Sequence, residues 1–446
     1  MWRTELKELW RLALPAIGSR LGLIGLGFVD TVLVGRFATA ELAALSLANR
    51  AAVLVLIVVS IGLLMGVIVA TAQSFGRGDP VATGRVWRRS MPYAFLLGLA
   101  MAAIAAASPL WMPWLTKDAA LVQRATRLAQ ILAIGIPGHL LFFTSGAFLE
   151  GIKRPLIPMT ILILANGLNL LLDWVLIYGH LGLPALGAAG AAWASTILRW
   201  AMAAAAAGYV LLAPSMRPFA VRRGAREPWD EWAHQRALGY ASAVSIAAEV
   251  GAFAALALIA ERLGAAVLAG QEIAINLLTL PFMLAVGLGS ASAVTVGAAR
   301  GQGDKAQARR FGLLGLTSSM LAAGMAGGLI AVFAEPLFFL HSRDTALAAI
   351  TIPALMLIGA IAPFDGGQAT ISMGLRGLGE TWWPTAIQMF SYLGVMLPLA
   401  IWLGLATGRG LVGLMEAVLA ASIVSVSLQT LRFLAATARE RQCQGG

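Results

Sequence analysis

The sequence predicts an all-α polytopic membrane protein with twelve transmembrane helices in two six-helix, pseudo-symmetric lobes. First, 59% of the 446 residues are hydrophobic and only 12% are charged, against about 25% charged in a soluble domain. Second, apolar runs of about 20 or more residues, long enough to cross a bilayer, follow one another along the chain. Third, the two halves resemble each other. The 49 glycines suit close packing of membrane helices.

The apolar runs define twelve predicted spans in two series, at residues 11–35, 43–74, 91–113, 125–149, 156–178 and 187–213, then at 236–262, 265–299, 310–337, 346–374, 382–404 and 410–435. Residues 214–234 between them concentrate Pro, Arg, acids and Trp, which predicts a cytoplasmic linker with an interfacial helix. We therefore expect an N-terminal lobe at 1–213, a linker at 214–234 and a C-terminal lobe at 235–446.

The first residues, MWRTELKELWRLALP, carry mixed charges and lack a small-residue cleavage site. This pattern predicts an interfacial helix that leads into the first span, not a signal peptide. The single cysteine, Cys443, allows no disulfide within one chain.

Basic residues predict the orientation, because Lys and Arg in short loops accumulate on the cytoplasmic side. The termini and the even-numbered loops hold 22 of the 32 Lys and Arg residues, whereas the other side holds seven. Both termini are therefore expected to be cytoplasmic. The net charge of +11 is spread over these loops without a basic domain, so no nucleic-acid partner is expected.

Two separate segments repeat at nearly the same offset. Residues 59–79 align without gaps on 284–304, where GRGD pairs with GQGD at an offset of 225. LEGIKRPLIP at 149–158 aligns on LRGLGETWWP at 375–384 at an offset of 226. Six-helix halves share one orientation, so these are parallel repeats about an axis along the membrane normal, which leaves a central cleft for alternating access.

The fifth predicted span, ILILANGLNLLLDW, carries Asn166, Asn169 and Asp173 at spacings of three and four. These spacings place the three side chains on one helical face, which must look into protein or a wet cavity. The amides can simply join packed helices by hydrogen bonds. A buried carboxylate, in contrast, needs a proton, a cation or a partner, so Asp173 is the stronger functional candidate.

The first span contains Asp30 in GLGFVDTVLVGR, with Pro15 upstream as a site for a bend. Asp30 lies near the predicted outer end and can be solvated at the interface. If it turns inward toward Asp173, the two carboxylates repel, so that one takes up a proton or both share a cation. Such a pair can sense protons or sodium.

The second half offers its own pair of acids within spans, Glu249 and Asp365. Pro363 and two glycines flank Asp365, loosen the helix and can free carbonyl oxygens to join both carboxylates around Na⁺. Under the repeat offset of 226, His139 is the position in the first half that is equivalent to Asp365. A histidine there is most often a packing residue, although it can also titrate.

Further polar and flexible residues are weaker candidates for a substrate cavity: Asn166, His139, Gln271, Asn276 and Met283. A cavity lined with Met and aromatic rings would bind flat apolar cations permissively. Arg199 lies mid-span and can either neutralise an acidic cluster or reach the interface.

The chain has no G-x-x-x-x-G-K-[ST], H-E-x-x-H or G-x-S-x-G motif, so we expect no ATP-driven transport, no enzyme and no cofactor. At this point the residues resemble a known family, the multidrug and toxic compound extrusion (MATE) transporters, closest to their NorM-type bacterial branch. The likeness covers nearly the whole chain and rests on GFVDTVLVG, GRGD and GQGD, LEGIKRP and LRGLGET, LDWVLIYG with LGAAGAAWAS, and AEVGAFA with QEIAIN.

The resemblance implies a multi-pass inner-membrane antiporter, expected to be a monomer among membrane lipids, that exports organic cations and drugs in exchange for Na⁺ or H⁺. It places Asp30, Asn169 and Asp173 in the family's acidic cluster, and Glu249 and Asp365 at its cation-binding carboxylates. The driving ion and the coupling lobe stay open. One alternative is a lipid-linked saccharide flippase of the same superfamily, which would need a basic cavity. Another is a membrane-embedded aspartyl hydrolase or prenyl transferase, which the absence of aspartate-rich clusters disfavours.

Overall fold

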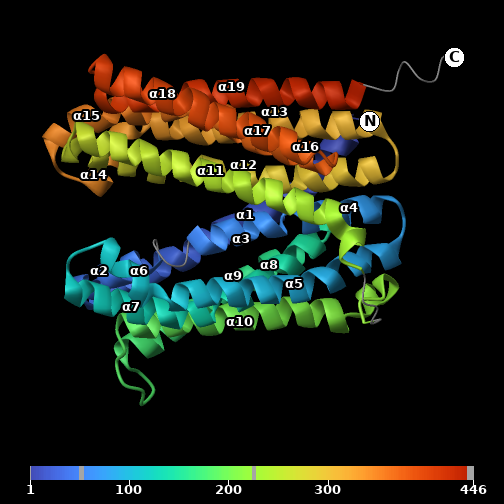
Figure 1. The fold of residues 1–446 in the computed structure, drawn as a ribbon, viewed down its shortest axis with the longest axis horizontal. Helices are drawn as coiled ribbons and strands as arrows, with labels where there is room; N and C mark the ends of the chain where they lie inside the picture. Colours follow the sequence, from blue (N-terminus) through green and yellow to red (C-terminus); the bar gives the residue numbers. More distant parts are fainter. Residues whose placement is uncertain (1, 50–54, 223–227, 439–446) are drawn as a thin grey trace. The chain divides into compact units, whose positions relative to one another are not determined.

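The computed structural model describes residues 2–49, 55–222 and 228–438, and every regular element in them is a helix (Figure 1). Ten helices are long and apolar enough to cross a membrane, and two bent helix pairs complete a set of twelve. The predicted fold class is therefore confirmed. Cys443 lies outside the described residues, as do Arg50 and four of the basic residues counted for the orientation: Arg223, Arg226, Arg439 and Arg441.

The helices of the first half are α1 Trp2–Phe37, α2 Thr39–Leu47, α3 Val55–Leu64, α4 Gly66–Gly76, α5 Pro80–Ala106, α6 Ser108–Trp111, α7 Ala119–Ile134, α8 Ile136–Gly151, α9 Leu156–Tyr178 and α10 Ala188–Leu212. The second half has α11 Ala233–Leu263, α12 Ala265–Gly301, α13 Lys305–Val332, α14 Ala334–His341, α15 Thr345–Met356, α16 Ile358–Gly377, α17 Trp382–Met389, η5 Phe390–Met396, α18 Leu397–Ala400, η6 Ile401–Ala406 and α19 Gly410–Ala438.

Three local features add to the sequence expectations. The first residues are helical and lead into the first span without a break, as α1 runs from Trp2 to Phe37, and their interfacial position stays a prediction. The linker's described residues form two short 3₁₀ helices, Pro214–Phe219 and Trp229–Trp232, since the prolines there lack a backbone donor. The predicted span at 382–404 contains two π-helical segments, η5 and η6, which no apolar pattern reveals.

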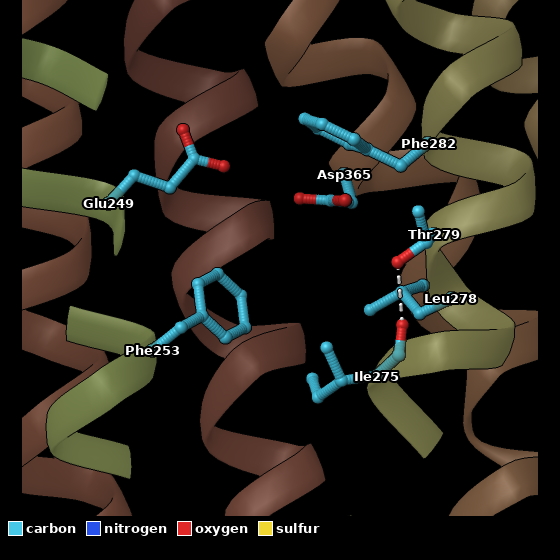
Figure 2. Close-up of a pocket in the computed structure, with 7 residues that line it drawn as sticks. All are labelled: Glu249, Phe253, Ile275, Leu278, Thr279, Phe282 and Asp365. Atoms are coloured by element: carbon cyan, nitrogen blue, oxygen red, sulfur yellow. Dashed lines mark hydrogen bonds between the residues drawn. The ribbon is translucent and has the colours of Figure 1, made fainter. Parts of the chain in front are cut away.

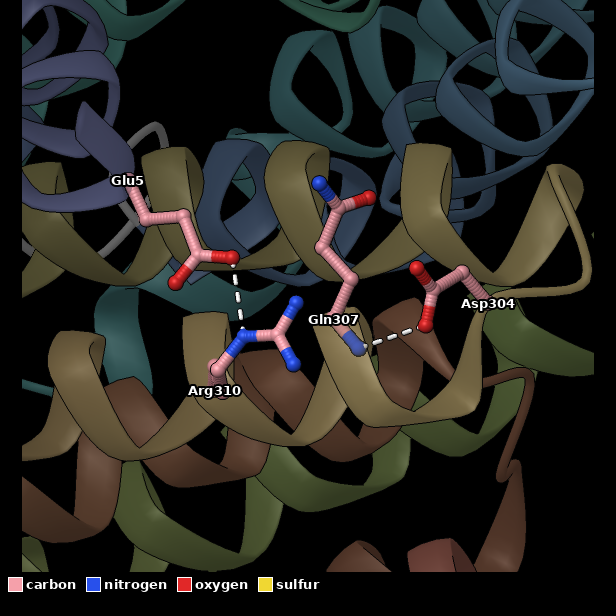
Figure 3. Close-up of polar contacts among 4 residues, drawn as sticks. All are labelled: Glu5, Asp304, Gln307 and Arg310. Carbon is pink, nitrogen blue, oxygen red and sulfur yellow. Dashed lines mark hydrogen bonds and ion pairs between the residues drawn. The ribbon is translucent and has the colours of Figure 1, made fainter. Parts of the chain in front are cut away.

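The predicted repeat also appears in the local geometry. Gly78 and Gly303 both have positive φ, +73° and +80°, which glycine adopts without strain. The aspartate after each glycine caps the next helix. Asp79 Oδ1 accepts from Ala82 N over 2.8 Å, and Asp304 Oδ1 accepts from Gln307 N over 2.8 Å, the contact drawn in Figure 3. The repeated G-x-G-D sequence is thus a turn followed by an N-cap.

Each half also contains one bent span. Asp118 caps α7, and the axis of the following helix α8 is bent by 42° from that of α7. Asp344 caps α15, and the axis of α16 is bent by 45° from that of α15. In the first half, α10 donates hydrogen bonds to carbonyl oxygens near the end of α7: Thr196 to Ile131, Arg199 to Leu132 and Trp200 to Ile134, over 3.0–3.2 Å. These bonds supply side-chain donors to carbonyls of the last helical turn, where donors within the helix run out. The Leu132 oxygen also accepts from the Gly135 nitrogen over 3.0 Å.

The chain divides into two compact units, Gly18–Ala243 and Met1–Ile17 with Val244–Gly446, which we call the N-terminal and the C-terminal unit. In the N-terminal unit α4, α5 and α8 pack on one another, and in the C-terminal unit α12, α13 and α16 do the same. The segments that match under the repeat offset therefore form matching triads. The predicted lobe boundaries at 213 and 235 stay a prediction.

The first helix of each half is divided between the units. Residues 2–17 of α1 pack in the C-terminal unit, where Glu5 pairs with Arg310 over 2.8 Å (Figure 3). A Cβ on Gly287 would lie 2.7 Å from the Ile17 backbone nitrogen, and one on Gly62 would lie 2.6 Å from the Ala243 Cα. Gly62 and Gly287 are paired by the offset of 225, so the same glycine in each repeat makes room for a closely packed helix.

Candidate functional site: two acidic sites in membrane helices

An acidic cluster lies in the N-terminal unit, where α9 meets α1 and α10. The Asn169 amide donates to both carboxyl groups, over 2.8 Å to Asp30 Oδ1 and 2.7 Å to Asp173 Oδ2. The Ser195 hydroxyl donates to the second Asp30 oxygen over 2.8 Å. We call these four residues the acidic cluster. Asp30 therefore turns inward, one of the two orientations that the sequence left open.

Three of the four residues of the acidic cluster are almost fully buried, and Ser195 is partly buried. Asn169 and Asp173 are 0% exposed and Asp30 is 8% exposed. The two carboxyl groups are close enough to interact. Asn169 Oδ1 and Asp173 Oδ1 are buried without a hydrogen-bond partner among the described residues. Two adjacent carboxyls with spare acceptor oxygens suit one proton or one small cation, because two buried negative charges side by side are unfavourable.

The spacing on α9 separates two roles. Asn169 and Asp173 stand four residues apart, so both point at Asp30 from one helical face. Asn166, one turn earlier, donates instead to the backbone oxygens of Gly22 and Leu162, over 3.1 and 2.8 Å. Its contacts therefore join α9 to α1. Its assignment to a substrate cavity stays a prediction.

A cavity of about 140 Å³ lies in the C-terminal unit between α11, α12 and α16. Glu249 and Asp365, the two acids predicted to hold a cation, both line it, from α11 and α16 (Figure 2). Phe253, Phe282 and the aliphatic residues Ile275 and Leu278 supply most of the remaining wall, with Thr279. This acid-lined cavity combines negative charge with aromatic rings, which suits a positively charged guest.

Behind the cavity, Asp365 belongs to a buried polar network centred on Gln368. The Gln368 amide donates to Asp365 over 3.4 Å and to the Tyr392 hydroxyl over 3.0 Å. Its oxygen accepts from Gln388 and Ser425, each over 3.3 Å. Gln368 is 0% exposed and uses two donors and two acceptor positions, the full capacity of a side-chain amide.

The remaining predicted residues lie elsewhere. His139 is partly buried in α8 near Arg199, whose guanidinium donates to a carbonyl of α7. Gln271 is buried, Asn276 is exposed and Met283 is partly buried on α12, and none of the three lines the acid-lined cavity. Their roles in substrate binding stay predictions.

Sequence reasoning missed Ser195, Gln368 and Tyr392. Gln368 was detectable, because it stands three residues after Asp365 on the same helical face. Ser195 reaches Asp30 from a different helix, 165 residues away in the chain. Tyr392 belongs to the π-helical segment η5, and such segments are frequent at functional sites. No local pattern reveals either residue.

A family model described as MatE matches residues 15–175 and 241–402. The chain belongs to the MatE family. The two matched segments correspond to the two halves found by internal comparison, and the resemblance drawn from the motifs is confirmed. As a MatE member, the chain is a multi-pass membrane protein of a transporter family.

Curated MatE relatives match over almost the entire chain. The probable multidrug resistance protein NorM of Caulobacter vibrioides is 34% identical, with 98% of this chain and 93% of that protein covered. The multidrug resistance protein PmpM of Pseudomonas aeruginosa is 30% identical, with 90% and 85% covered. A solved structure, described as the outward-facing conformation of a multidrug resistance MATE family transporter of the MOP superfamily, has a TM-score of 0.88 at 21% identity, with 97% and 96% covered, and supports the fold.

Proposed function

We propose that this chain is a secondary active multidrug efflux antiporter that exports organic cations in exchange for entering Na⁺ or H⁺. Family membership and the names of the NorM and PmpM relatives support drug efflux. The observation that carries the antiport proposal is the acidic cluster, because spare buried oxygens beside two carboxyls suit exchange of a proton or cation. We further propose that the protein lies in the inner membrane of a bacterium with both termini in the cytoplasm. We propose that it works as a monomer among membrane lipids and needs no nucleic-acid partner and no cofactor.

In the proposed mechanism, Asp30, Asn169 and Asp173 couple transport in one unit, and Glu249 and Asp365 couple it in the other, where they hold Na⁺ if sodium is the driving ion. Binding of a proton or Na⁺ neutralises a buried carboxyl and weakens its attraction for a cationic drug. Drug and ion then shift one conformational equilibrium in opposite directions, and the coupling is reciprocal.

The acid-lined cavity supports an organic cation as the substrate class. Glu249 and Asp365 supply negative charge, and the rings of Phe253 and Phe282 attract cations through their faces. Asn166, His139, Gln271, Asn276 and Met283 are the further residues that we propose for substrate contact. The alternative, a lipid-linked saccharide flippase, needs basic groups for pyrophosphate. The residues lining this cavity include two acids and no Lys or Arg.

The decisive experiment is ethidium transport by the purified chain in liposomes, with sodium and proton gradients imposed separately. We expect a sodium gradient, a proton gradient or both to drive ethidium from low to high concentration, with the ion moving across the membrane in the opposite direction. Liposomes without protein and liposomes with a dissipated gradient are the controls. If folded protein moves no ethidium under either gradient, the antiport proposal fails, and transbilayer movement of a lipid-linked saccharide becomes the next assay.

A further inference from the structure

Two rows of polar side chains face each other between α16 and α19. Their members share a spacing of three and then four residues, and they are Asp365, Gln368 and Ser372 on α16 and Ser422, Ser425 and Gln429 on α19. This spacing keeps each row on one face of its helix. We call the two rows the polar seam.

The rows contact each other in register. Ser422 donates to Asp365 over 3.5 Å, and three residues further along both helices Ser425 donates to Gln368 over 3.3 Å. Gln429 continues the chain of contacts by donating to Ser425 over 2.9 Å. The two helices therefore run in the same direction here, and the polar seam is continuous from Asp365 to Gln429.

The polar seam is deeply buried, and its end has a spare ligand atom. Gln368, Ser422, Ser425 and Gln429 are each 0% exposed. Gln429 Oε1 is buried and has no hydrogen-bond partner among the described residues. Leaving such an acceptor unpaired is unfavourable. At the end of a row of amides and hydroxyls, this oxygen is available as a ligand for a cation.

The polar seam has a direction. It begins at a wall residue of the acid-lined cavity, Asp365, and proceeds toward the C-terminal ends of α16 and α19. Seven residues of helix correspond to about 10 Å. Two arginines lie beyond its end. Arg376, four residues after Ser372 on α16, is buried and interacts with Glu249, and the positive charge of Arg432 is balanced by Glu380 over 2.6 Å. The basic residues of the sequence predict that this end is cytoplasmic.

We propose that the polar seam is the route by which Na⁺ leaves the acid-lined cavity toward the cytoplasm. Carboxylate, amide and hydroxyl oxygens can replace the hydration shell of a small cation in succession. After Asp365 the polar seam contains only Gln and Ser, and the amides serve Na⁺ as ligands but do not readily pass on protons. The inference rests on the proposed antiport and deepens it, because it names sodium as the coupling ion of the C-terminal unit.

The test compares Gln429→Met, which keeps the shape without the oxygen, with Gln429→Glu, which keeps an oxygen. Radioactive Na⁺ uptake into liposomes is driven by an opposing ethidium gradient, and equilibrium ethidium binding is measured against sodium concentration. We expect Gln429→Met to slow Na⁺ uptake about tenfold, Gln429→Glu to slow it less, and the sodium dependence of binding to be unchanged in both. Ser391→Ala is the control, because Ser391 is buried and, among the described residues, donates to the Ile387 carbonyl one turn earlier, away from the polar seam.

Uptake by Gln429→Met equal to that of the wild type, or equally slow uptake by both variants, would overturn the proposal. If Gln429→Met does not elute as a folded monodisperse protein, Ser425→Ala takes its place with the same expected slowing. Ethidium binding distinguishes failure of the antiport proposal from failure of the sodium route. If ethidium binding to the wild type does not depend on sodium, the antiport proposal is contradicted. If it does, and Gln429→Met takes up Na⁺ as fast as the wild type, only the route through the polar seam is contradicted.

Discussion

The acidic cluster and the acid-lined cavity use the same residue types in opposite ways. In the N-terminal unit one amide bonds to two carboxyls over 2.7–2.8 Å, and both of these acids are buried. In the C-terminal unit two acids line a cavity of about 140 Å³, and the hydrogen-bond contacts of Asp365 with other described residues are long, 3.4–3.5 Å. The first geometry suits a proton or a dehydrated ion at a fixed position. The second suits an ion that enters and leaves with part of its hydration shell.

The largest expected effect comes from neutralising one acid in each unit. We expect Asp30→Asn and Asp365→Asn each to fold and to export ethidium about tenfold more slowly than the wild type. A tenfold slower rate corresponds to a transport barrier that is higher by about 1.4 kcal/mol. Drug resistance of cells that express each variant gives the measurement, with membrane abundance as the control. Normal resistance in both variants would reject the assigned roles. Normal resistance in only one would identify the other unit as the coupling unit.

The two central amides give the next largest effect. Asn169→Ala deprives two carboxyls of their shared donor, which we expect to cost about 2–3 kcal/mol. Gln368→Ala breaks four contacts, so we expect a larger fall in the thermal unfolding midpoint. If Asn169→Ala instead unfolds at a lower temperature than Gln368→Ala, the acidic cluster contributes more to stability than the polar network around Gln368.

Two serines form a matched pair for a smaller effect. Ser195→Ala removes a 2.8 Å hydrogen bond to Asp30, which we expect to cost about 1.5–3 kcal/mol because the acceptor is a carboxylate. Ser422→Ala removes a 3.5 Å contact to Asp365, beyond the usual hydrogen-bond range, and should cost about 0.5 kcal/mol or less. The thermal unfolding midpoints of the two variants show whether Ser195→Ala destabilises the protein more than Ser422→Ala. Equal losses would contradict the view that only the first site is tightly organised.

The smallest effect is expected at Asn166, one turn before the acidic cluster. Asn166→Ala should destabilise the protein by about 0.6 kcal/mol, the average for a hydrogen bond between membrane helices. Because Asn166 is one of the proposed substrate contacts, the variant should also lower ethidium efflux, but less than the loss of a carboxyl group does. Unfolding and ethidium efflux are measured on the same preparation. Efflux equal to that of the wild type, together with the expected loss of stability, would remove Asn166 from the proposed substrate contacts and leave it as a residue that joins α9 to α1.

The sequence predicted the spans and the cluster residues of α9 because burial in lipid and helical spacing are local properties. Asn169 and Asp173 had to share a face, and apolar runs had to become helices. Contacts between distant helices were beyond reach, as Ser195 shows. So were the π-helical segment around Tyr392 and the unpaired oxygen of Gln429, which depend on how three helices pack and not on any spacing within one.

The division of α1 and α11 between the two units bears on how the chain assembles during synthesis. The N-terminal unit extends to Ala243, so it cannot complete its packing until the start of α11 has been made. Residues 2–17, made first, obtain their partners only when Gly287 and Arg310 follow. Since domains generally fold as units during synthesis, we expect a chain stopped near residue 213 to be trapped by chaperones or degraded, and one stopped after residue 263 to persist longer.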